Sequence, residues 1–234
     1  MNEVQKHLDL QRDLYIYTGP SLSRDITREL APNATILPPA KRGDLALDSF
    51  EMLPKVIVLI DGELFQNLTV SPREIMKLLE NGVTVIGAAS IGAIRAVELR
   101  NLGMIGVGCV YEMYLSNEVI ADDEVVMAMD PITSEPYSEP AVNFRFLIKE
   151  AINRGVFTQE MYERTIDELK KVYFSKRNLQ ILLAIVRELY GHDVSNQIEQ
   201  LAHNFDYQIK SMDAKKAIEK GLNLFNQCSL KEVN

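Results

Sequence analysis

The sequence is short of the residues that mark several classes of protein. Its 234 residues include two cysteines, three histidines and no tryptophan. The two cysteines, Cys109 and Cys228, are too few for a disulfide framework or a zinc cluster. No apolar run approaches the roughly 20 residues that span a bilayer, and the first residues are polar and charged. We therefore expect a cytoplasmic protein with neither a transmembrane helix nor a secretory signal.

Positive charge is also scarce. Lysine and arginine number 25 against 33 acidic residues, which gives a formal net charge of −8. Such a balance disfavours a coat for nucleic acid or a binder of anionic membranes, so we expect neither partner. By contrast, 47% of the residues are hydrophobic, which is enough for a sizeable core. The length predicts one large domain, or one domain with a helical appendage.

Strand and helix patterns alternate through the first part of the chain. Apolar, β-branched runs predict strands, and helical patterns lie between them. Strands separated by helices favour a mostly parallel sheet with helices on both faces, an α/β core domain that we place in residues 1–142. The expected strands are residues 14–18, 34–37, 55–60 and 83–86, and residues 106–114 are expected to form one more strand and the loop leaving it. The expected helices are residues 23–30, 71–80 and 91–102.

Two of these helices carry clear boundary signals. Ser71 and Glu74 form a capping box around Pro72, which fits the first helical position. Gly103 is placed as the residue that ends the later helix. Both signals predict ordinary helix ends, so we interpret Glu74 as a capping residue.

After Pro140 the pattern becomes all-helical. In this region the apolar residues recur at helical spacing, which indicates helices with one buried face. Residues 143–234 are therefore expected to pack on the core, or to serve oligomerisation of identical chains or partner docking. The expected helices are residues 143–154, 158–173, 177–190, 194–204 and 212–226.

Small and polar residues directly follow the expected strands. Gly19 and Ser21 follow the first strand, Asp61 and Gly62 the third, and Ser90 the fourth. The carboxyl ends of parallel strands lie along one edge of a sheet, where ligands of open α/β sheets bind. We therefore predict that these residues converge on one pocket.

Ser90 carries the sharpest of these signals. It lies between a strand and a helix in the string Ala88-Ala89-Ser90-Ile91-Gly92, which is similar to the nucleophile elbow of serine hydrolases. A helix N-terminus at this point supplies donors for an oxyanion. The alternative is that Ser90 is only a helix cap, because serine is favoured there.

The base that would activate Ser90 is not settled by the sequence. The histidines His7, His192 and His203 are all remote from the motifs. Asp61, Glu98 and Lys41 are the alternatives to an imidazole.

Two pairs of charged residues have both a functional and a structural interpretation. Arg95 and Glu98 stand three residues apart on one helix, as an anion anchor or as a structural salt bridge. Asp122 and Asp123 belong to an acidic cluster that could bind Mg²⁺, or that simply lies in solvent. We predict no cofactor, and Mg²⁺ is the alternative that this cluster leaves open.

Asn143 and Arg145 are similarly ambiguous, since Asn143 can cap the helix that begins there. Cys109 falls in an expected strand and is interpreted as a core thiol.

Taken in order, the motifs resemble one family. They are GPSL, LPPAKRGDL, LIDGELF, TVSPREI, GAASIGAIRAVELRNLGMIGVG, ADDEV and SEPAVNFR, and the resemblance spans about residues 15–145. This ordered set resembles the TfuA-like core domain.

The resemblance implies a role in peptide modification. TfuA-like proteins are partners of YcaO enzymes, which use ATP to install thioamides in the backbone of ribosomal peptides. The resemblance further implies a ThiS-type sulfur-carrier protein as partner, whose C-terminal thiocarboxylate is hydrolysed to release sulfide. Such hydrolysis is acyl transfer, which needs a nucleophile or positioned water and an oxyanion stabiliser.

The family motifs carry over onto particular residues of this chain. Ser90, Arg95 and Glu98 match the family's S-x-G-A-x-R-A-x-E-L core, and with Asp61 they are the expected catalytic residues. The expected substrate-binding residues are Gly19, Ser21, Asp44, Gly62, Asn143 and Arg145. Many members also carry Trp-His-Lys-Glu where this chain has residues 71–74, so that histidine is absent here.

Two other functions remain as alternatives. One is a non-catalytic adaptor that docks or modulates the YcaO enzyme. The other is a nucleotide- or phosphate-binding domain that uses the helix N-termini near Ser21 and Ser90, with Arg95 as anion partner. No complete glycine-rich phosphate loop follows a strand, which disfavours this last alternative.

Overall fold

The computed structural model describes residues 13–64, 67–130 and 135–231, and the chain divides into two compact units. The first, which we call the sheet unit, combines residues 1–120 with residues 210–234. The second, which we call the helical unit, consists of residues 121–209.

The sheet unit is built on five parallel strands in the order β2-β1-β3-β4-β5. Their register pairs Ile16 with Val58 and Val58 with Ile86, so the strands are aligned across the sheet. Every residue of β3 is buried, as its β-branched composition predicts for a central strand. The prediction of a parallel α/β sheet is confirmed. The strands are β1 (Leu14–Tyr17), β2 (Thr35–Leu37), β3 (Val56–Leu59), β4 (Thr84–Ala88) and β5 (Ile105–Val107).

The helices between the strands begin and end largely where the sequence indicates. In α3 the Ser71 hydroxyl accepts a bond from the Glu74 N–H, and the Glu74 carboxylate accepts one from the Ser71 N–H. Gly103 has φ of +101° and ends the turn that follows α4. The elements are α2 (Arg24–Leu30), η1 (Leu47–Ser49), α3 (Pro72–Glu80), α4 (Ile91–Leu99), η2 (Arg100–Leu102) and α5 (Cys109–Leu115).

The segment expected to leave the last strand as a loop is a helix, and the expectation that Cys109 lies in a strand was wrong. β5 ends at Val107, and Cys109 is the first residue of α5. Gly108 has φ of +96°, a conformation that glycine adopts without strain, so the chain turns directly from strand to helix. Cys109 is consequently half-buried at a helix start.

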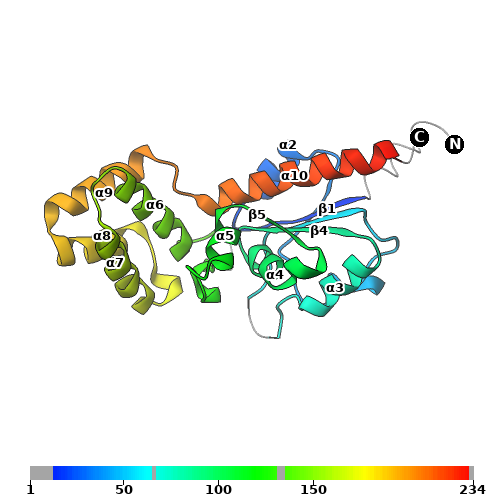
Figure 1. The fold of residues 1–234 in the computed structure, drawn as a ribbon, viewed down its shortest axis with the longest axis horizontal. Helices are drawn as coiled ribbons and strands as arrows, with labels where there is room; N and C mark the ends of the chain where they lie inside the picture. Colours follow the sequence, from blue (N-terminus) through cyan, green and yellow to red (C-terminus); the bar gives the residue numbers. More distant parts are fainter. Residues whose placement is uncertain (1–12, 65–66, 131–134, 232–234) are drawn as a thin grey trace. The chain divides into compact units, whose positions relative to one another are not determined.

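The final helix, α10 (Ile209–Lys231), covers one face of the sheet. Its Ala214, Ala217 and Ile218 pack in one core with Ile16 and Val58 of the strands. Figure 1 shows α10 and α2 on one side of the sheet, with α3 and α4 on the other. Helices on both faces of the sheet are thus confirmed.

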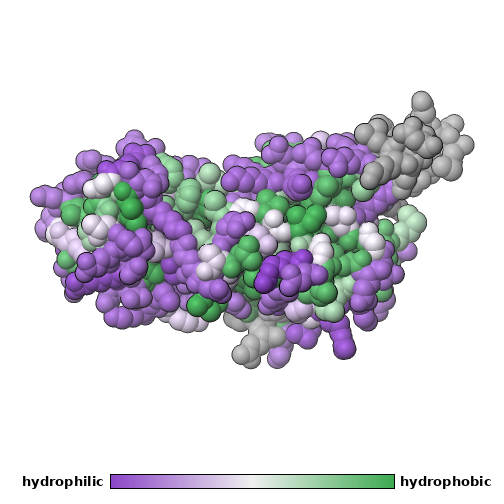
Figure 2. Space-filling view, in the orientation of Figure 1, coloured by the Kyte–Doolittle hydropathy of each residue, from purple (hydrophilic) through white to green (hydrophobic). Residues whose placement is uncertain are grey.

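The outer face of α10 is charged along the middle of the helix. Lys215, Lys216, Glu219 and Lys220 are exposed, and Figure 2 shows mostly hydrophilic residues over this helix. Among the described residues no helix combines the length and apolarity needed to cross a membrane.

The helical unit has a core of its own. Residues such as Phe144, Leu147, Leu182, Val186 and Ile198 are fully buried within it. Its elements are η3 (Asp122–Glu124), α6 (Ala141–Asn153), α7 (Gln159–Lys171), η4 (Phe174–Lys176), α8 (Leu179–Tyr190) and α9 (His192–Asn204).

The compact units differ in their bounds from the predicted regions 1–142 and 143–234. Residues 121–142 belong with the helical unit, because the Glu124 carboxylate pairs with Arg145 of α6. Residues 210–234 belong with the sheet unit, because the apolar face of α10 covers strands that would otherwise be exposed.

We expect Gly221→Ala to destabilise the protein by about 1–3 kcal/mol, the usual cost of overpacking a core. A Cβ at Gly221 would lie 2.6 Å from Cγ2 of Val58 in β3. In an exposed helix the same change is stabilising by up to ~1 kcal/mol. Asn223→Ala, on the exposed side of α10, is the matched control and should not destabilise. Urea unfolding measures both, and a stabilised Gly221→Ala variant would contradict the packing of α10 on the sheet.

Candidate active site

The sheet has a topological switch point between β1 and β3. The chain leaves β1 for β2 on one side and continues through β3, β4 and β5 on the other. Loops that follow neighbouring strands then diverge, which leaves room for a ligand at the carboxyl edge. Gly19 and Ser21 follow β1, and Asp61 follows β3, so the predicted residues lie at this point.

Asp61 joins the two loops through three hydrogen bonds. Its Oδ2 accepts from the N–H groups of Gly19 and Ser21 at 2.8 and 3.0 Å. Its Oδ1 accepts from the Ser21 hydroxyl at 2.6 Å. Asp61 is only 1% exposed, so these donors hold a buried negative charge in a fixed position.

Ser90 lies in a strained turn between β4 and α4. Ala89 has φ of +64°, which is unusual for a residue with a Cβ, and the Ser90 N–H donates to the Ala88 carbonyl at 2.7 Å. Strain of this kind gathers at functional sites. Although Ser90 occupies the cap position of α4, its side chain makes no capping hydrogen bond.

The Ser90 hydroxyl instead contacts a buried lysine. Lys210, in the first turn of α10, places its Nζ 3.4 Å from Ser90 Oγ. The two residues are 2% and 4% exposed. Burial lowers the pKa of Lys210 to about 8, although the negative charge of Asp61 acts in the opposite direction. The Ser90 hydroxyl, the Lys210 amine with its lowered pKa and the Asp61 carboxylate are thus gathered at one edge of the sheet.

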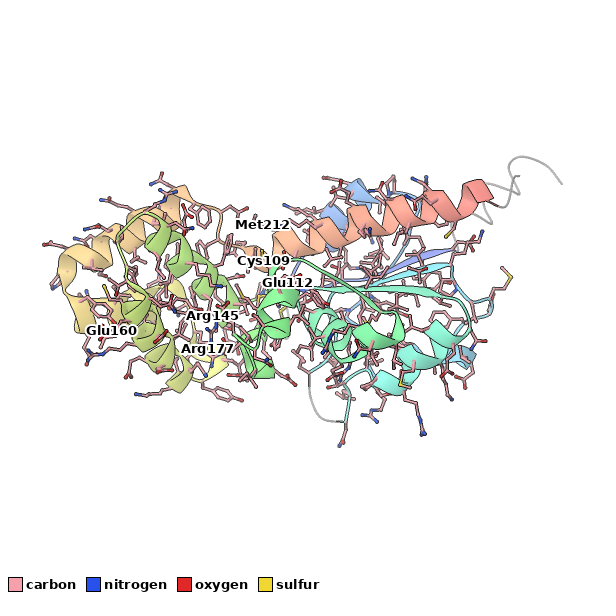
Figure 3. The ribbon with its side chains drawn as sticks, in the orientation of Figure 1. Cys109, Glu112, Arg145, Glu160, Arg177 and Met212 are labelled. Atoms are coloured by element: carbon pink, nitrogen blue, oxygen red, sulfur yellow. The ribbon has the colours of Figure 1, made fainter. Side chains whose placement is uncertain are left out.

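Asp213 fixes the start of α10 on the sheet unit. Its carboxylate accepts a hydrogen bond from the Val110 N–H of α5 at 2.7 Å. Figure 3 shows Cys109 of α5 close to Met212 of α10, as this bond requires. Because Lys210 lies one turn before Asp213 on α10, the same hydrogen bond helps to position the Lys210 side chain.

The sequence analysis missed Lys210, which is 120 positions from Ser90. One signal was available. Lys210 and Asp213 share a helical stripe with Ala214, Ala217 and Ile218, all of which are buried. A lysine on an otherwise apolar helix face is rarely left buried without a functional or structural reason.

The other predicted residues of the sheet unit shape the surrounding loops. A Cβ at Gly62 would lie 2.6 Å from the Ala40 carbonyl and 2.8 Å from Cγ2 of Ile91, so only glycine fits this contact. Gly19 packs against Pro39 in the same way. The Asp44 carboxylate accepts the Lys41 N–H at 2.9 Å and holds a turn.

Arg95 and Glu98 form the salt bridge that their spacing indicates, at 2.7 Å. The Arg95 Nε also donates to the Val70 carbonyl at 2.8 Å. These contacts tie α4 to the segment before α3. Their predicted catalytic roles stay predictions.

Asn143 and Arg145 belong to the helical unit. Arg145 donates two bonds to the buried Glu124 carboxylate, at 2.5 and 3.0 Å, and one to the Tyr162 hydroxyl. Asn143 lies inside α6 rather than at its cap, which is Pro140, and its Nδ2 donates to Gln208 at 2.8 Å. These bonds hold the unit together, and a role in substrate binding stays a prediction.

The acidic cluster also has a partner within the helical unit. Asp123 pairs with the buried Arg177 at 2.6 Å, and Figure 3 marks this arginine and Arg145 in the same unit. Within residues 13–64, 67–130 and 135–231, no group of three or more acidic, histidine or cysteine side chains is placed to hold a metal ion. His192 and His203 lie in α9, and His7 lies outside the described residues.

Two open depressions of the described surface lie away from Ser90. One, of about 360 Å³, runs along α6 beside Phe146 and Lys149, and another, of about 350 Å³, lies between Leu30 and α10. Ser90 and Lys210 are 4% and 2% exposed, so both side chains are covered in this structure.

Lys210→Met should fold, and at pH 7 it should be at least as stable as the wild type. Below pH 8 the folded and unfolded wild-type chains both carry the charged amine, so the wild type bears the full cost of burying it. Between pH 8 and 10.5 the folded chain loses this proton first, so wild-type stability rises with pH relative to the variant. The shift is on the order of 3 kcal/mol.

Urea unfolding of both proteins at pH 7 and pH 10 measures this effect. Lys215→Met, an exposed position on the same helix, should show no such pH dependence. A Lys210→Met variant that is several kcal/mol less stable at pH 7 would show instead that the amine is a stabilising structural group.

Comparison with known proteins agrees with the resemblance noted in the motifs. A family model described as TfuA-like protein matches residues 61–178, just over half of the chain. Asp61, Ser90 and Arg95 lie within the match, whereas Ser21 and Lys210 lie outside it. No curated protein matches the chain. By the extent of the family match, the chain belongs to the TfuA-like protein family.

Proposed function

We propose that this protein releases sulfide from the C-terminal thiocarboxylate of a ThiS-type sulfur carrier and supplies it to a YcaO enzyme that installs thioamides in peptides. Membership of the TfuA-like family, which is associated with YcaO thioamidation, supports the pathway. The observation that supports the chemistry is the Ser90 hydroxyl, which is not used as a cap and faces the buried Lys210 amine.

The reaction is hydrolysis of an acyl group. The thiocarboxylate and water give a carboxylate, hydrosulfide and one proton, so no oxidant or reductant is needed. Oxygen must attack the acyl carbon, and the carbon–sulfur bond must break as the hydrosulfide leaves. Ser90 is the oxygen nucleophile that the site offers.

The N-terminus of α4 supplies the positive potential that the oxyanion needs. In its first turn the N–H groups of Gly92 and Ala93 already donate hydrogen bonds to the carbonyls of Ile60 and Ser90, respectively. The N–H of Ile91 follows the nucleophile directly, which is the position of an oxyanion donor in serine hydrolases. Because these two N–H groups already bond to protein carbonyls, they cannot also bind a phosphate at this turn, which disfavours the nucleotide-binding alternative.

Access to the site requires a conformational change. Asp61, Ser90 and Lys210 are each at most 4% exposed. The carrier tail must therefore displace the residues that cover them before it can reach the Ser90 hydroxyl.

Ser90→Ala should lower sulfide release from a thiocarboxylated ThiS-type carrier by at least about a hundredfold, since it removes the nucleophile. Its stability should fall by no more than about 1–3 kcal/mol, because the hydroxyl does not cap α4 but does contact the buried Lys210 amine. Ser71→Ala is the matched control. That serine caps α3, so its loss should cost ~1 kcal/mol of stability and leave sulfide release unchanged.

Sulfide is measured by a colorimetric or fluorogenic assay after the folded state of each variant is checked by thermal unfolding. A folded Ser90→Ala variant with undiminished release would remove Ser90 from the reaction. If the wild type releases no sulfide yet co-purifies with a YcaO enzyme, the adaptor function replaces the hydrolytic one.

A further inference from the structure

The motif at residues 138–145 lies in the helical unit, where it holds the stretch of chain just before α10. The Tyr207 hydroxyl donates to the Glu139 carboxylate at 2.9 Å. The Asn143 Nδ2 donates to the Gln208 side chain at 2.8 Å. The partners are 68 and 65 positions apart, so these bonds fix residues 207 and 208 against a distant part of the helical unit. We call the two hydrogen bonds the α10 clamp.

The side chains that make the α10 clamp are themselves held in place. Through its other carboxylate oxygen, Glu139 accepts the Leu179 N–H at 3.2 Å. Asn143 lies inside α6 and is 1% exposed. The Tyr207 ring stacks on the buried Phe144, with ring centroids 6.3 Å apart. Burial and the Glu139 charge both raise the pKa of Tyr207, so its hydroxyl keeps its proton and remains a donor.

Lys210 follows the α10 clamp by two residues and lies in the first turn of α10. The N–H groups of a first turn have no partner within the helix, so helix ends fray unless another contact holds them. Burial of the Lys210 ammonium adds to this tendency, because the charge regains its hydration when the turn opens. Asp213 holds the next turn of the helix through the Val110 N–H. The α10 clamp holds the residues on the preceding side, so the turn of Lys210 is fixed from both ends.

We propose that the α10 clamp positions Lys210 for the reaction, by keeping the first turn of α10 folded with the amine at Ser90. This inference rests on the proposed function and gives Glu139 and Asn143 a part in it that needs no contact with the substrate. Both act through the backbone that leads into α10, so they are positioning residues.

The number of bonds sets the size of the expected effect. A hydrogen bond in a folded protein changes an equilibrium by roughly fivefold, and a bond to a charged group changes it by more. Without both bonds of the α10 clamp, the open form of the first turn should become at least about tenfold more populated. In that form the Lys210 amine lies in water, where it reacts with amine reagents.

The test compares the full-length wild type with the double variant Tyr207→Phe/Gln208→Ala, which lacks the α10 clamp. Phenylalanine keeps the ring on Phe144, and Gln208 is exposed, so neither change opens a cavity in the core. Acetylation by N-acetoxysuccinimide, followed by peptide mass spectrometry, measures the reactivity of each lysine. Lys210 should react at least about tenfold faster in the double variant, whereas the exposed Lys215 should react equally in both proteins.

Tyr190→Phe is the matched control, since it removes the same kind of hydroxyl from the same unit. The Tyr190 hydroxyl donates to the Met161 carbonyl at 3.2 Å and so joins α8 to α7. This variant should keep the wild-type acetylation rate at Lys210 and the wild-type rate of sulfide release. Thermal unfolding first checks that each variant is folded at the assay temperature.

Sulfide release from a thiocarboxylated ThiS-type carrier should fall at least about fivefold in the double variant, because small displacements at a reacting site cost much of the rate. Equal acetylation of Lys210 in the double variant and the wild type would overturn the positioning role. Faster acetylation with undiminished sulfide release would overturn it as well. A wild type that releases no sulfide would defeat the proposed function, whereas the acetylation result, which needs no sulfide release, would still decide whether the α10 clamp holds Lys210.

Discussion

The central constraint of this structure is the burial of the Lys210 amine against the Ser90 hydroxyl. Placing Lys210 at 2% exposure opposes stability, because an ammonium loses its hydration there. Asp61 offsets part of this cost, and its own charge is satisfied by Gly19 and Ser21. Because this arrangement lowers stability, folding alone gives no reason for it, and its position beside Ser90 favours a functional reason.

The fold supplies this arrangement from distant parts of the chain. The switch point between β1 and β3 brings Asp61 to Ser21, and β4 delivers Ser90 through the strained turn at Ala89. α10 returns from the helical unit to cover the sheet, and its first turn completes the site with Lys210. The helical unit has a buried ion pair between Arg145 and Glu124 and a second pair in which only Arg177 is buried, so these residues serve its cohesion as well as any docking role.

Local signals predicted the parts of this fold that local physics determines. The apolar run of β3 and the capping box at Ser71 are examples, and the strand-end rule brought Ser21 and Asp61 together. Such rules could not predict that α10 packs on the sheet, because apolar residues at helical spacing show that one face of a helix is buried but not which element buries it. For the same reason Lys210 was missed, although a lysine on that stripe was a visible anomaly.

The most direct test of the account is a crystal structure of the full-length protein at a pH above 8. In that structure Lys210 Nζ should lie within about 3.5 Å of Ser90 Oγ, with the Asp61 carboxylate still bound by the loop after β1. A Ser90 hydroxyl that caps α4, with the Lys210 side chain directed to solvent, would contradict it.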